Sequence, residues 1–468
     1  MPEIPAPLQR RSFLKGAVGA GVGLAFASPF GALAARTAAA APGGNGNGGG
    51  APTGIGYGPL YPAKDRATGL ELLKLPRGFE YTSFGWTGDP MTDGQATPSS
   101  HDGMAAFRDG DAVRLVRNHE RTSGTSFAPA SSTYDPAFGG GTTNLTFDPE
   151  RGELTESYGS LSGTIRNCAG GPHPNASWLS CEETTTVSNL VGGLETPSSV
   201  RHGYIFEVPA AGFGSGDPIK PMGRFSHEAT ATDPATGIVY ETEDSGSSVL
   251  YRYIPTNRGD LAAGGVLQAM ALKDANGAPI PTTVPWTTGM QARAEWVVVD
   301  NPDPAAGAES TSSQARAKGG SIISRGEGAW YGNGVIYAIS TNGGPARQGQ
   351  VFSYDPVTSL FTCVFASPSA DVLNAPDNVC VSPRGGLVLC EDGSGREYLH
   401  GLSPEGEIFR FAENNVVLTG TKGFSGDFTG SEWAGACFEP KNGNWMFANL
   451  QSPGITFAVT GPWRKGVL

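Results

Sequence analysis

Six short segments of the chain combine a side chain that can bind a metal ion with small or apolar neighbours. Five of them carry an acid, and the remaining one carries the thiol of Cys168. Carboxylates that gather in a narrow space repel one another strongly unless cations neutralise them. Oxygen donors suit calcium and a thiolate suits a transition metal, so these segments would form a site for several metal ions if they met in space. The segments are His101-Asp102-Gly103, Cys168-Ala169-Gly170, His227-Glu228-Ala229, Arg325-Gly326-Glu327-Gly328, Asp377-Asn378 and Glu432-Trp433-Ala434-Gly435.

A degenerate repeat contains these segments. The chain has 69 glycines and 36 prolines and few long segments of helical period, which indicates many short strands and tight turns. Each unit runs from a small-residue strand start through an apolar strand that ends in an acid or amide, and then to another apolar strand. The clearest copies are Ala229 to Pro255, Gly334 to Pro356 and Val379 to Phe411, and weaker copies start at His101, Asn167 and Glu432.

Six copies of this unit predict an all-β fold, a six-bladed β-propeller, with a pair of β-sandwiches as the alternative. The innermost strands of propeller blades run side by side along a central channel, so their equivalent ends meet near one axis. We therefore expect the acids and Cys168 to form a metal site on that axis. The segment from Asn257 to Lys318 is too long for a connection between blades, and two further strands are predicted in it, Val266 to Leu272 and Glu295 to Asp300.

The first part of the chain has the features of an export signal. The sequence Gln9-Arg10-Arg11-Ser12-Phe13-Leu14-Lys15 indicates a twin-arginine signal, and an apolar run from Gly16 to Leu33 follows it. That run is too rich in glycine and too interrupted to form a stable membrane anchor. We expect residues 1–41 to be a cleaved signal peptide, 42–54 a flexible Gly-rich linker and 55–468 a single propeller domain. The twin-arginine translocase would then deliver the protein to the periplasm, the cell surface or the medium.

The charge of the chain narrows the possible partners. The formal net charge is −12, and it becomes −15 without residues 1–41, because four basic residues and one acidic residue are lost. Such acidity argues against nucleic-acid binding and is compatible with bound cations. We expect a monomer. Six cysteines in an exported chain of this size permit disulfides without requiring them, and a bridge among Cys363, Cys380, Cys390 and Cys437 is left open.

A series of longer motifs follows in a defined order along the chain. They are Asn118-His119-Glu120, Gly141-Thr142-Thr143-Asn144-Leu145, Asn167-Cys168-Ala169-Gly170-Gly171, Trp178-Leu179-Ser180-Cys181-Glu182-Glu183, Phe225-Ser226-His227-Glu228-Ala229, Arg325-Gly326-Glu327-Gly328, Pro376-Asp377-Asn378, Glu432-Trp433-Ala434-Gly435 and Gln451-Ser452-Pro453-Gly454. In this order the motifs resemble those of the PhoX-type alkaline phosphatases, which are exported, calcium- and iron-dependent propeller enzymes. The resemblance extends over nearly the whole mature chain.

The resemblance implies a set of metal ions and ligands. The active site of that family holds a pair of ferric ions with calcium ions nearby, so the implied cofactors are two Fe³⁺ and two or three Ca²⁺. By motif, Cys168 would be the thiolate on iron, Glu228 the bridging carboxylate and Glu327 the acid of the Arg-x-Glu-Gly motif. Asp377 and Asp244 are similar to further metal carboxylates of the family.

The resemblance also assigns Glu120 and Asn144 as oxygen ligands on the calcium side, and Arg325 as the arginine that contacts the substrate phosphate. These roles suit the hydrolysis of phosphate monoesters, because clustered cations neutralise the phosphoryl oxygens and a planar guanidinium binds two of them at once. The implied protein is an exported, metal-dependent alkaline phosphatase that acts on a small phosphomonoester.

Some residues depart from the family pattern or are set aside. Pro172-His173-Pro174 stands where the family has Thr-Pro-Trp, and Gly326 stands where it has proline. Both departures concern substrate range and rate more than metal binding. Glu182 and Glu183 are interpreted as supporting residues and Glu432 as a residue that organises the last blade, so none of the three is in the predicted site.

Two other functions are compatible with a metal-binding propeller. A calcium-dependent, lactonase- or esterase-like hydrolase would need calcium alone and could dispense with Cys168. A non-catalytic binding propeller, in which the metals only brace the channel, would hydrolyse no phosphoester and would tolerate Arg325→Ala.

Overall fold

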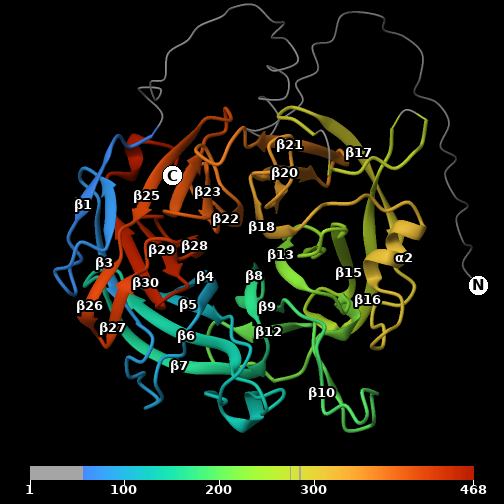
Figure 1. The fold of residues 1–468 in the computed structure, drawn as a ribbon, viewed down its shortest axis with the longest axis horizontal. Helices are drawn as coiled ribbons and strands as arrows, with labels where there is room; N and C mark the ends of the chain where they lie inside the picture. The colour runs from blue at the N-terminus through green and yellow to red at the C-terminus, as the bar shows by residue number, and fades with distance from the viewer. Residues whose placement is uncertain (1–55, 275, 284–285) are drawn as a thin grey trace, which may run out of the picture.

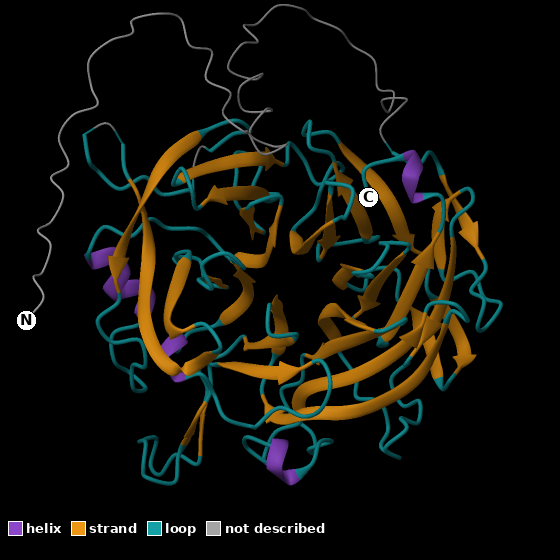
Figure 2. Cartoon of the chain, turned by 180° about the vertical axis from the view of Figure 1, so that it is seen from behind, coloured by secondary structure: helices purple, strands orange, loops and turns teal. Residues whose placement is uncertain are grey.

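Strands make up nearly all of the regular structure in the computed structural model, which describes residues 56–274, 276–283 and 286–468. The sheets surround a central axis like the blades of a propeller, and successive parts of the chain follow one another around it (Figures 1 and 2). The predicted all-β, propeller-like fold is therefore confirmed. The predicted signal peptide and linker lie outside the described residues. Within the described residues, no helix is both long and apolar enough to cross a membrane.

The innermost strands form a closed circle around the axis. Each of them packs against the next, and the last packs against the first. Each begins at, or one residue from, a segment that the sequence pattern singles out. They are β4 (His101–Asp109), β8 (Asn167–His173), β13 (His227–Thr232), β18 (Gly326–Gly332), β22 (Pro376–Val381) and β28 (Trp433–Phe438).

The first two sheets of the circle are separate antiparallel blades. The first sheet has the order β4, β5 (Ala112–His119), β6 (Gly140–Asp148) and β7 (Glu153–Thr164). The second has the order β8, β9 (Ser177–Glu182) and β12 (Ile205–Pro209). A small hairpin, β10 (Val187–Ser188) and β11 (Val200–Arg201), lies between β9 and β12 in the sequence.

The next two inner strands belong to one continuous sheet. Its order is β13, β14 (Val239–Glu243), β15 (Tyr251–Asn257), β16 (Asp260–Leu272), β17 (Gln291–Val298), β21 (Leu360–Ala366), β20 (Gln350–Asp355), β19 (Val335–Ser340) and β18. β17 pairs with β16 on one side and with β21 on the other, so it joins the outer edge of the blade that starts at β13 to the outer edge of the blade that starts at β18. The two strands predicted in the long connecting segment are thus present. β16 is longer than its predicted range, and β17 begins and ends earlier than predicted.

The remaining inner strands lead to the closure of the circle. One sheet has the order β22, β23 (Leu387–Glu391), β24 (Tyr398–Leu402), β25 (Ile408–Asn414), β2 (Leu73–Pro76) and β1 (Leu60–Ala63). The other has the order β28, β29 (Trp445–Leu450), β30 (Ile455–Thr460) and β3 (Glu80–Phe84). Because β3 near the start of the chain pairs with β30 near its end, the last blade is completed by a strand from the other end of the described chain, which closes the circle.

The remaining elements are short. They are the hairpin β26 (Val417–Thr421) and β27 (Phe424–Asp427), the helix α2 (Thr311–Ala317), and the 3-10 turns η1 (Ala130–Ser132), η2 (Lys220–Met222) and η3 (Trp463–Lys465).

The small residues beside the acids allow the inner strands to approach one another closely. A Cβ atom on Gly103 would lie 2.6 Å from the Cα atom of Ala169, and one on Gly328 would lie 2.6 Å from the backbone oxygen of Asp377. A larger residue at either position would push neighbouring inner strands apart. The pattern of an acid followed by glycine therefore has a packing reason.

Side chains fill the axis just beyond the strand starts. Trp330, in β18, packs against hydrophobic clusters on several sides. Ala169, Ala229 and Ala436 line the same part of the axis. This layer forms a floor beneath the starts of the inner strands.

The six cysteines are all free and buried. The disulfide that the sequence left open among Cys363, Cys380, Cys390 and Cys437 is therefore not formed. The thiols of these four residues pack in the hydrophobic clusters between sheets, where cysteine behaves as a small apolar residue.

Candidate metal centre and active site

Three equivalent positions in each blade surround the axis. The inner ring is the second residue of each inner strand, the outer ring is the residue that follows each adjacent strand, and the rim is the residue that precedes each inner strand. The inner ring is Asp102, Cys168, Glu228, Glu327, Asp377 and Ala434. The outer ring is Glu120, Glu183, Asp244, Thr341, Asp392 and Gln451. The rim is Ser100, Arg166, Ser226, Arg325, Ala375 and Glu432.

The same backbone hydrogen bond links the outer ring to the rim in every blade. The outer-ring N–H donates to the rim carbonyl, over distances from 2.9 Å for Glu120 and Ser100 to 3.2 Å for Gln451 and Glu432. This bond holds the end of one strand beside the start of the next. The side chains of all three positions are therefore fixed near the same end of the axis.

An irregularity in each inner strand turns the inner-ring side chains toward the axis. The pairing register of every inner strand shifts near its start, for example between His101 and Met104 and between Asn167 and Gly170. A β-bulge changes the direction of the side chain that it contains. Asp102 and Cys168 lie inside these two shifts, and their side chains are buried.

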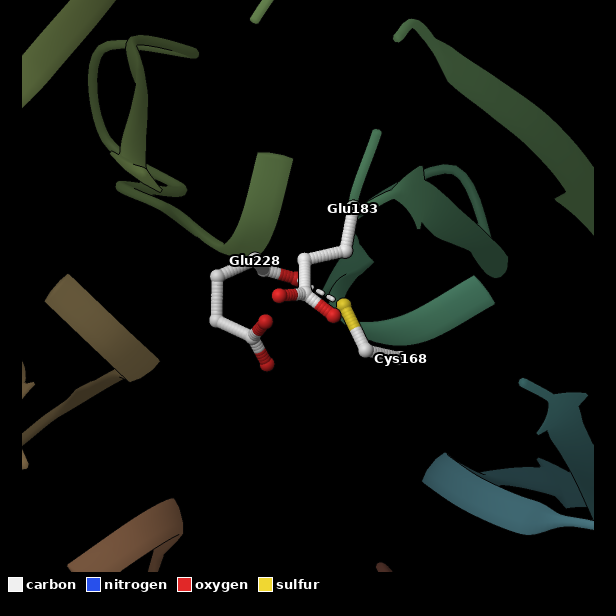
Figure 3. A group of neighbouring side chains, drawn as sticks. All are labelled: Cys168, Glu183 and Glu228. Atoms are coloured by element: carbon white, nitrogen blue, oxygen red, sulfur yellow. Dashed lines mark hydrogen bonds between the residues drawn. The ribbon is translucent and has the colours of Figure 1, made fainter. Parts of the chain in front are cut away.

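Cys168, Glu183 and Glu228 form a first group of possible metal ligands. The Sγ atom of Cys168 and one oxygen from each carboxylate lie within 4.8 Å of one another, a spacing that one ion about 2.0–2.4 Å from each donor can bridge. Figure 3 shows the three side chains converging from neighbouring parts of the circle. The thiol lies 3.5 Å from the backbone oxygen of His227. A thiolate with two carboxylates is a donor set that suits a transition metal.

Glu228, Glu327 and Asp377 form a second group on the same criterion of 4.8 Å. Glu228 belongs to both groups, so the two possible ion positions are neighbours that share one carboxylate. The second group offers oxygen donors only. The structure thus brings Cys168, Glu228, Glu327 and Asp377 together as the sequence predicted, and their roles as ligands stay predictions.

The acids of these groups cannot all be charged without cations nearby. Burial, followed by repulsion from Glu327, raises the pKa of Glu228 well above its usual value. Burial and repulsion from Asp392 raise the pKa of Asp377 to about 7. Burial raises the pKa of Glu183 to about 9, although Arg166 opposes the shift. Bound cations would reverse these shifts, so the arrangement fits metal ions better than free carboxylates.

More acids lie on the side of the axis next to Asp377. Asp102 is 1% exposed, and its Oδ1 atom is buried without a hydrogen-bond partner. Burial and then Asp102 raise the pKa of Glu432 well above its usual value. Gln451 donates a 2.7 Å hydrogen bond to Glu120. An open pocket of about 400 Å³, lined in part by Asp392, Glu432 and Gln451, reaches these residues from outside.

Arg325, at the rim, contacts the second ligand group through Glu327. Its guanidinium binds both oxygens of Asp244 at 2.9 and 3.0 Å and one oxygen of Glu327 at 2.9 Å. The side chain remains 44% exposed, so part of it is accessible to solvent. The hydrogen bond and the charges of these acids raise the pKa of Arg325, which keeps it a cation at any relevant pH.

Glu120 and Asn144, the predicted calcium ligands, have different surroundings. Glu120 lies in the outer ring and binds Arg166 and Gln451. The structure does not bring Asn144 to either ligand group. Asn144 is in β6, two strands from the axis, and its amide donates to the carbonyls of Pro209 and Ala210.

The ligand set predicted from the sequence did not include several acids that lie at the site. Glu183 belongs to the first ligand group, and Asp102, Asp392 and Glu432 lie among the other acids. The structure places Glu183 beside Cys168 and Glu228, and it places Glu432 close enough to Asp102 for the two charges to repel, so both become candidate ligands whose roles are untested. The sequence contained a signal for Glu183 and Asp392, because the repeat already ended its apolar strand in an acid or amide.

The fold and this cluster describe a propeller-like protein with a candidate metal centre on its axis, and comparisons identify its family. The sequence profile of the family described as alkaline phosphatase PhoX matches residues 55–155 and 149–454. The chain therefore belongs to the PhoX family of alkaline phosphatases and is a metal-dependent phosphatase.

A solved PhoX structure agrees with this assignment at the level of the fold. Pseudomonas fluorescens PhoX in complex with vanadate, a transition state analogue, is similar with a TM-score of 0.63 and 16% identity, over 89% of this chain and 99% of that chain. A gluconolactonase from Xanthomonas campestris has a TM-score of 0.44 and 12% identity, over 86% of this chain and 98% of that chain. No curated protein matches the sequence significantly.

Proposed function

We propose that this protein is an exported phosphatase that hydrolyses phosphate monoesters at a clustered iron and calcium centre in a six-bladed propeller. The observation that carries the proposal is the pair of adjoining ligand groups that share Glu228, one containing a thiol and the other carboxylates alone. The closed circle of inner strands and the three repeated positions around it support six blades within a single domain of residues 55–468.

The donor types suggest how the metals are distributed. Fe³⁺ would be held by Cys168, Glu183 and Glu228, and a second Fe³⁺ by Glu228 and its carboxylate neighbours. Two or three Ca²⁺ would be held by oxygen donors, including Glu120, Asp244 and the acids of the pocket, and Asn144 remains a candidate ligand outside them. When bound, the metals would supply positive charge to the phosphoryl oxygens.

The side chains of the protein then bind and orient the substrate. Arg325 is partly exposed beside Glu327, so its guanidinium can turn from Asp244 toward a phosphoryl oxygen. Trp330 and the small residues around it close the axis below the cluster, so substrate enters from the rim. The departure at Pro172-His173-Pro174 lies at the far end of β8 from Cys168, away from the reacting groups.

The twin-arginine signal in residues 1–41 supports export in the folded state. That route suits a protein whose metals are bound before translocation, and it predicts a location in the periplasm, at the cell surface or outside the cell. The negative charge, the small-molecule substrate and the closed circle of sheets are compatible with a monomer that binds no nucleic acid.

Metal analysis and a phosphatase assay of the exported protein test this proposal together. We expect both iron and calcium in the purified protein, and hydrolysis of p-nitrophenyl phosphate at alkaline pH that a chelator abolishes. Calcium without iron, or bound iron with no phosphatase activity, would contradict it.

The variant Cys168→Ala tests the thiolate separately. It should lose iron and at least about 100-fold in activity, because loss of a supporting residue alone costs 10- to 100-fold at metal sites. Cys437→Ala, which removes a buried thiol away from the ligand groups, is the matched control and should keep both. Retention of iron in Cys168→Ala would show that the thiol is not a ligand.

A further inference from the structure

Arg166 and Arg325 occupy equivalent rim positions on either side of Glu228. Arg166 directly precedes β8 and Arg325 directly precedes β18, with the blade of Glu228 between them. Both have a left-handed backbone, with φ of 51° and 46°. Ser100 and Ala375, at the same rim position of other blades, share this conformation with φ of 55° and 48°, so it is a feature of the rim position that both arginines occupy.

The two arginines also bind the ligand groups in the same way. Arg166 lies 2.6 Å from Glu183 and 3.0 Å from Glu120, and Arg325 lies 2.9 Å from Glu327 and from Asp244. Each guanidinium therefore contacts one acid of one ligand group and one acid of the outer ring. The carboxyl groups of Glu183 and Asp244 are themselves close enough to share a hydrogen bond, so they lie between the two arginines.

Arg166 keeps part of its guanidinium available. Its side chain is 40% exposed, close to the 44% of Arg325. Its Nε atom contacts Glu120 and its Nη2 atom contacts Glu183. Arg117, by contrast, is only 1% exposed, and its guanidinium donates to Gly85 and Thr456 in the interior.

We propose that Arg166 is a second phosphate-binding residue, which contacts the phosphoryl group from the side opposite to Arg325. The inference rests on the proposed phosphatase function and on the role of Arg325 within it. A phosphoryl group in transfer spreads negative charge over three equatorial oxygens, so two guanidiniums on opposite sides can each stabilise a different oxygen. A site with both arginines should favour a terminal phosphate monoester over a diester, which presents one charged oxygen fewer.

Vanadate inhibition of the metal-loaded enzyme tests the proposal. Arg166→Ala should weaken inhibition by vanadate and raise KM for p-nitrophenyl phosphate, with a loss in kcat/KM of about 100-fold, as for removal of one stabilising donor. Iron and calcium contents should remain those of the unmodified enzyme. Arg166→Lys should restore part of the loss, because it keeps the charge but not the paired N–H groups.

Arg201→Ala is the matched control. Arg201 also binds two acids, Glu195 and Asp303, and its side chain is 30% exposed, but it lies in the β10–β11 hairpin. This variant should leave kcat/KM and vanadate inhibition unchanged.

The outcomes separate this inference from the proposed function. Unchanged vanadate inhibition in Arg166→Ala, alongside weakened inhibition in Arg325→Ala, would overturn the role of Arg166 and leave the phosphatase assignment intact. If Arg166→Ala loses metal, the comparison is made with Arg166→Lys, and unchanged inhibition in that metal-loaded variant overturns the role. If the unmodified protein hydrolyses no phosphomonoester, the proposed function fails, and calorimetric binding of vanadate to the same variants still decides whether Arg166 binds the anion.

Discussion

Two adjacent glutamates at the end of β9 have different surroundings. Glu182 is fully buried and accepts hydrogen bonds from the backbone N–H groups of Ile165 and Gly203, at 2.9 and 2.8 Å. It also lies 2.6 Å from His202. Glu183, one residue later, joins Cys168 in the first ligand group. Successive side chains of an extended chain point to opposite sides, so Glu182 points into the blade and Glu183 toward Cys168 and Glu228.

We predict that substitutions at these two positions have different effects. Glu183→Gln should keep the fold but lose iron, with a fall in activity of about 100-fold. Glu182→Gln should keep iron but lower the free energy of unfolding by about 1–3 kcal/mol, because its new amide cannot accept all of the same bonds. Denaturant unfolding and iron analysis of both variants check this. If Glu182→Gln loses iron and Glu183→Gln keeps it, the assignment of Glu183 as the ligand is contradicted.

Hydrogen bonds between blades hold the inner ring in place. Asn118, in β5, donates to the backbone oxygens of Cys168 and Ala169 at 3.2 and 2.7 Å, and it accepts from Trp178 and Ser180. The same arrangement recurs where an adjacent strand faces the next inner strand. Thr242 donates to the backbone oxygen of Glu327, and Asn449 donates to that of Asp102.

We predict that Asn118→Ala weakens both the fold and the metal site. It leaves the buried N–H of Trp178 and the carbonyl of Ala169 without partners, which should cost about 2–4 kcal/mol of the free energy of unfolding. Iron affinity should fall by about 10- to 100-fold, because the strand that carries Cys168 is no longer fixed. The control is Asn175→Ala, because Asn175 is exposed in the turn between β8 and β9, at the end of β8 far from Cys168. Equal effects of the two variants on iron affinity would rule out the positioning role.

In the whole molecule, the repeated sequence unit predicted the inner strands well, but it did not predict how the units are connected. The starts of the inner strands and the convergence of Cys168, Glu228, Glu327 and Asp377 followed from the pattern, because each acid stands beside small residues that the close packing requires. The place of Glu183 in the first ligand group was harder to predict, because Glu182 and Glu183 both close the apolar strand and only the residue at which β9 ends distinguishes them. Equally, the pairing of β17 with β21 is a contact between distant segments that no local pattern encodes.

The number of buried acids makes the stability of the metal-free protein depend on pH. In the folded state burial raises the pKa of Asp377 to about 7 and that of Glu183 to about 9, whereas unfolded carboxyls titrate near 4. The folded protein therefore binds more protons than the unfolded chain between about pH 4 and 9. Its free energy of unfolding falls as the pH rises through that range.

We predict that the chelated protein melts at least about 5 °C lower at pH 9 than at pH 5, since a few kcal/mol shift the midpoint by that much. Thermal unfolding followed by circular dichroism measures this. The melting temperature of the metal-loaded protein should not fall in this way. Chelated Glu183→Gln should lose less stability between pH 7 and 9 than the chelated unmodified protein. A chelated protein that is more stable at pH 9 would contradict the account.

We infer that Glu228 joins two neighbouring metal positions. Iron analysis of purified Glu228→Gln and Glu327→Gln tests it most directly, because only Glu228 belongs to both ligand groups. We predict that Glu228→Gln loses both irons together with its activity, whereas Glu327→Gln keeps the iron that Cys168 binds. An unchanged iron content in folded Glu228→Gln would contradict the claim.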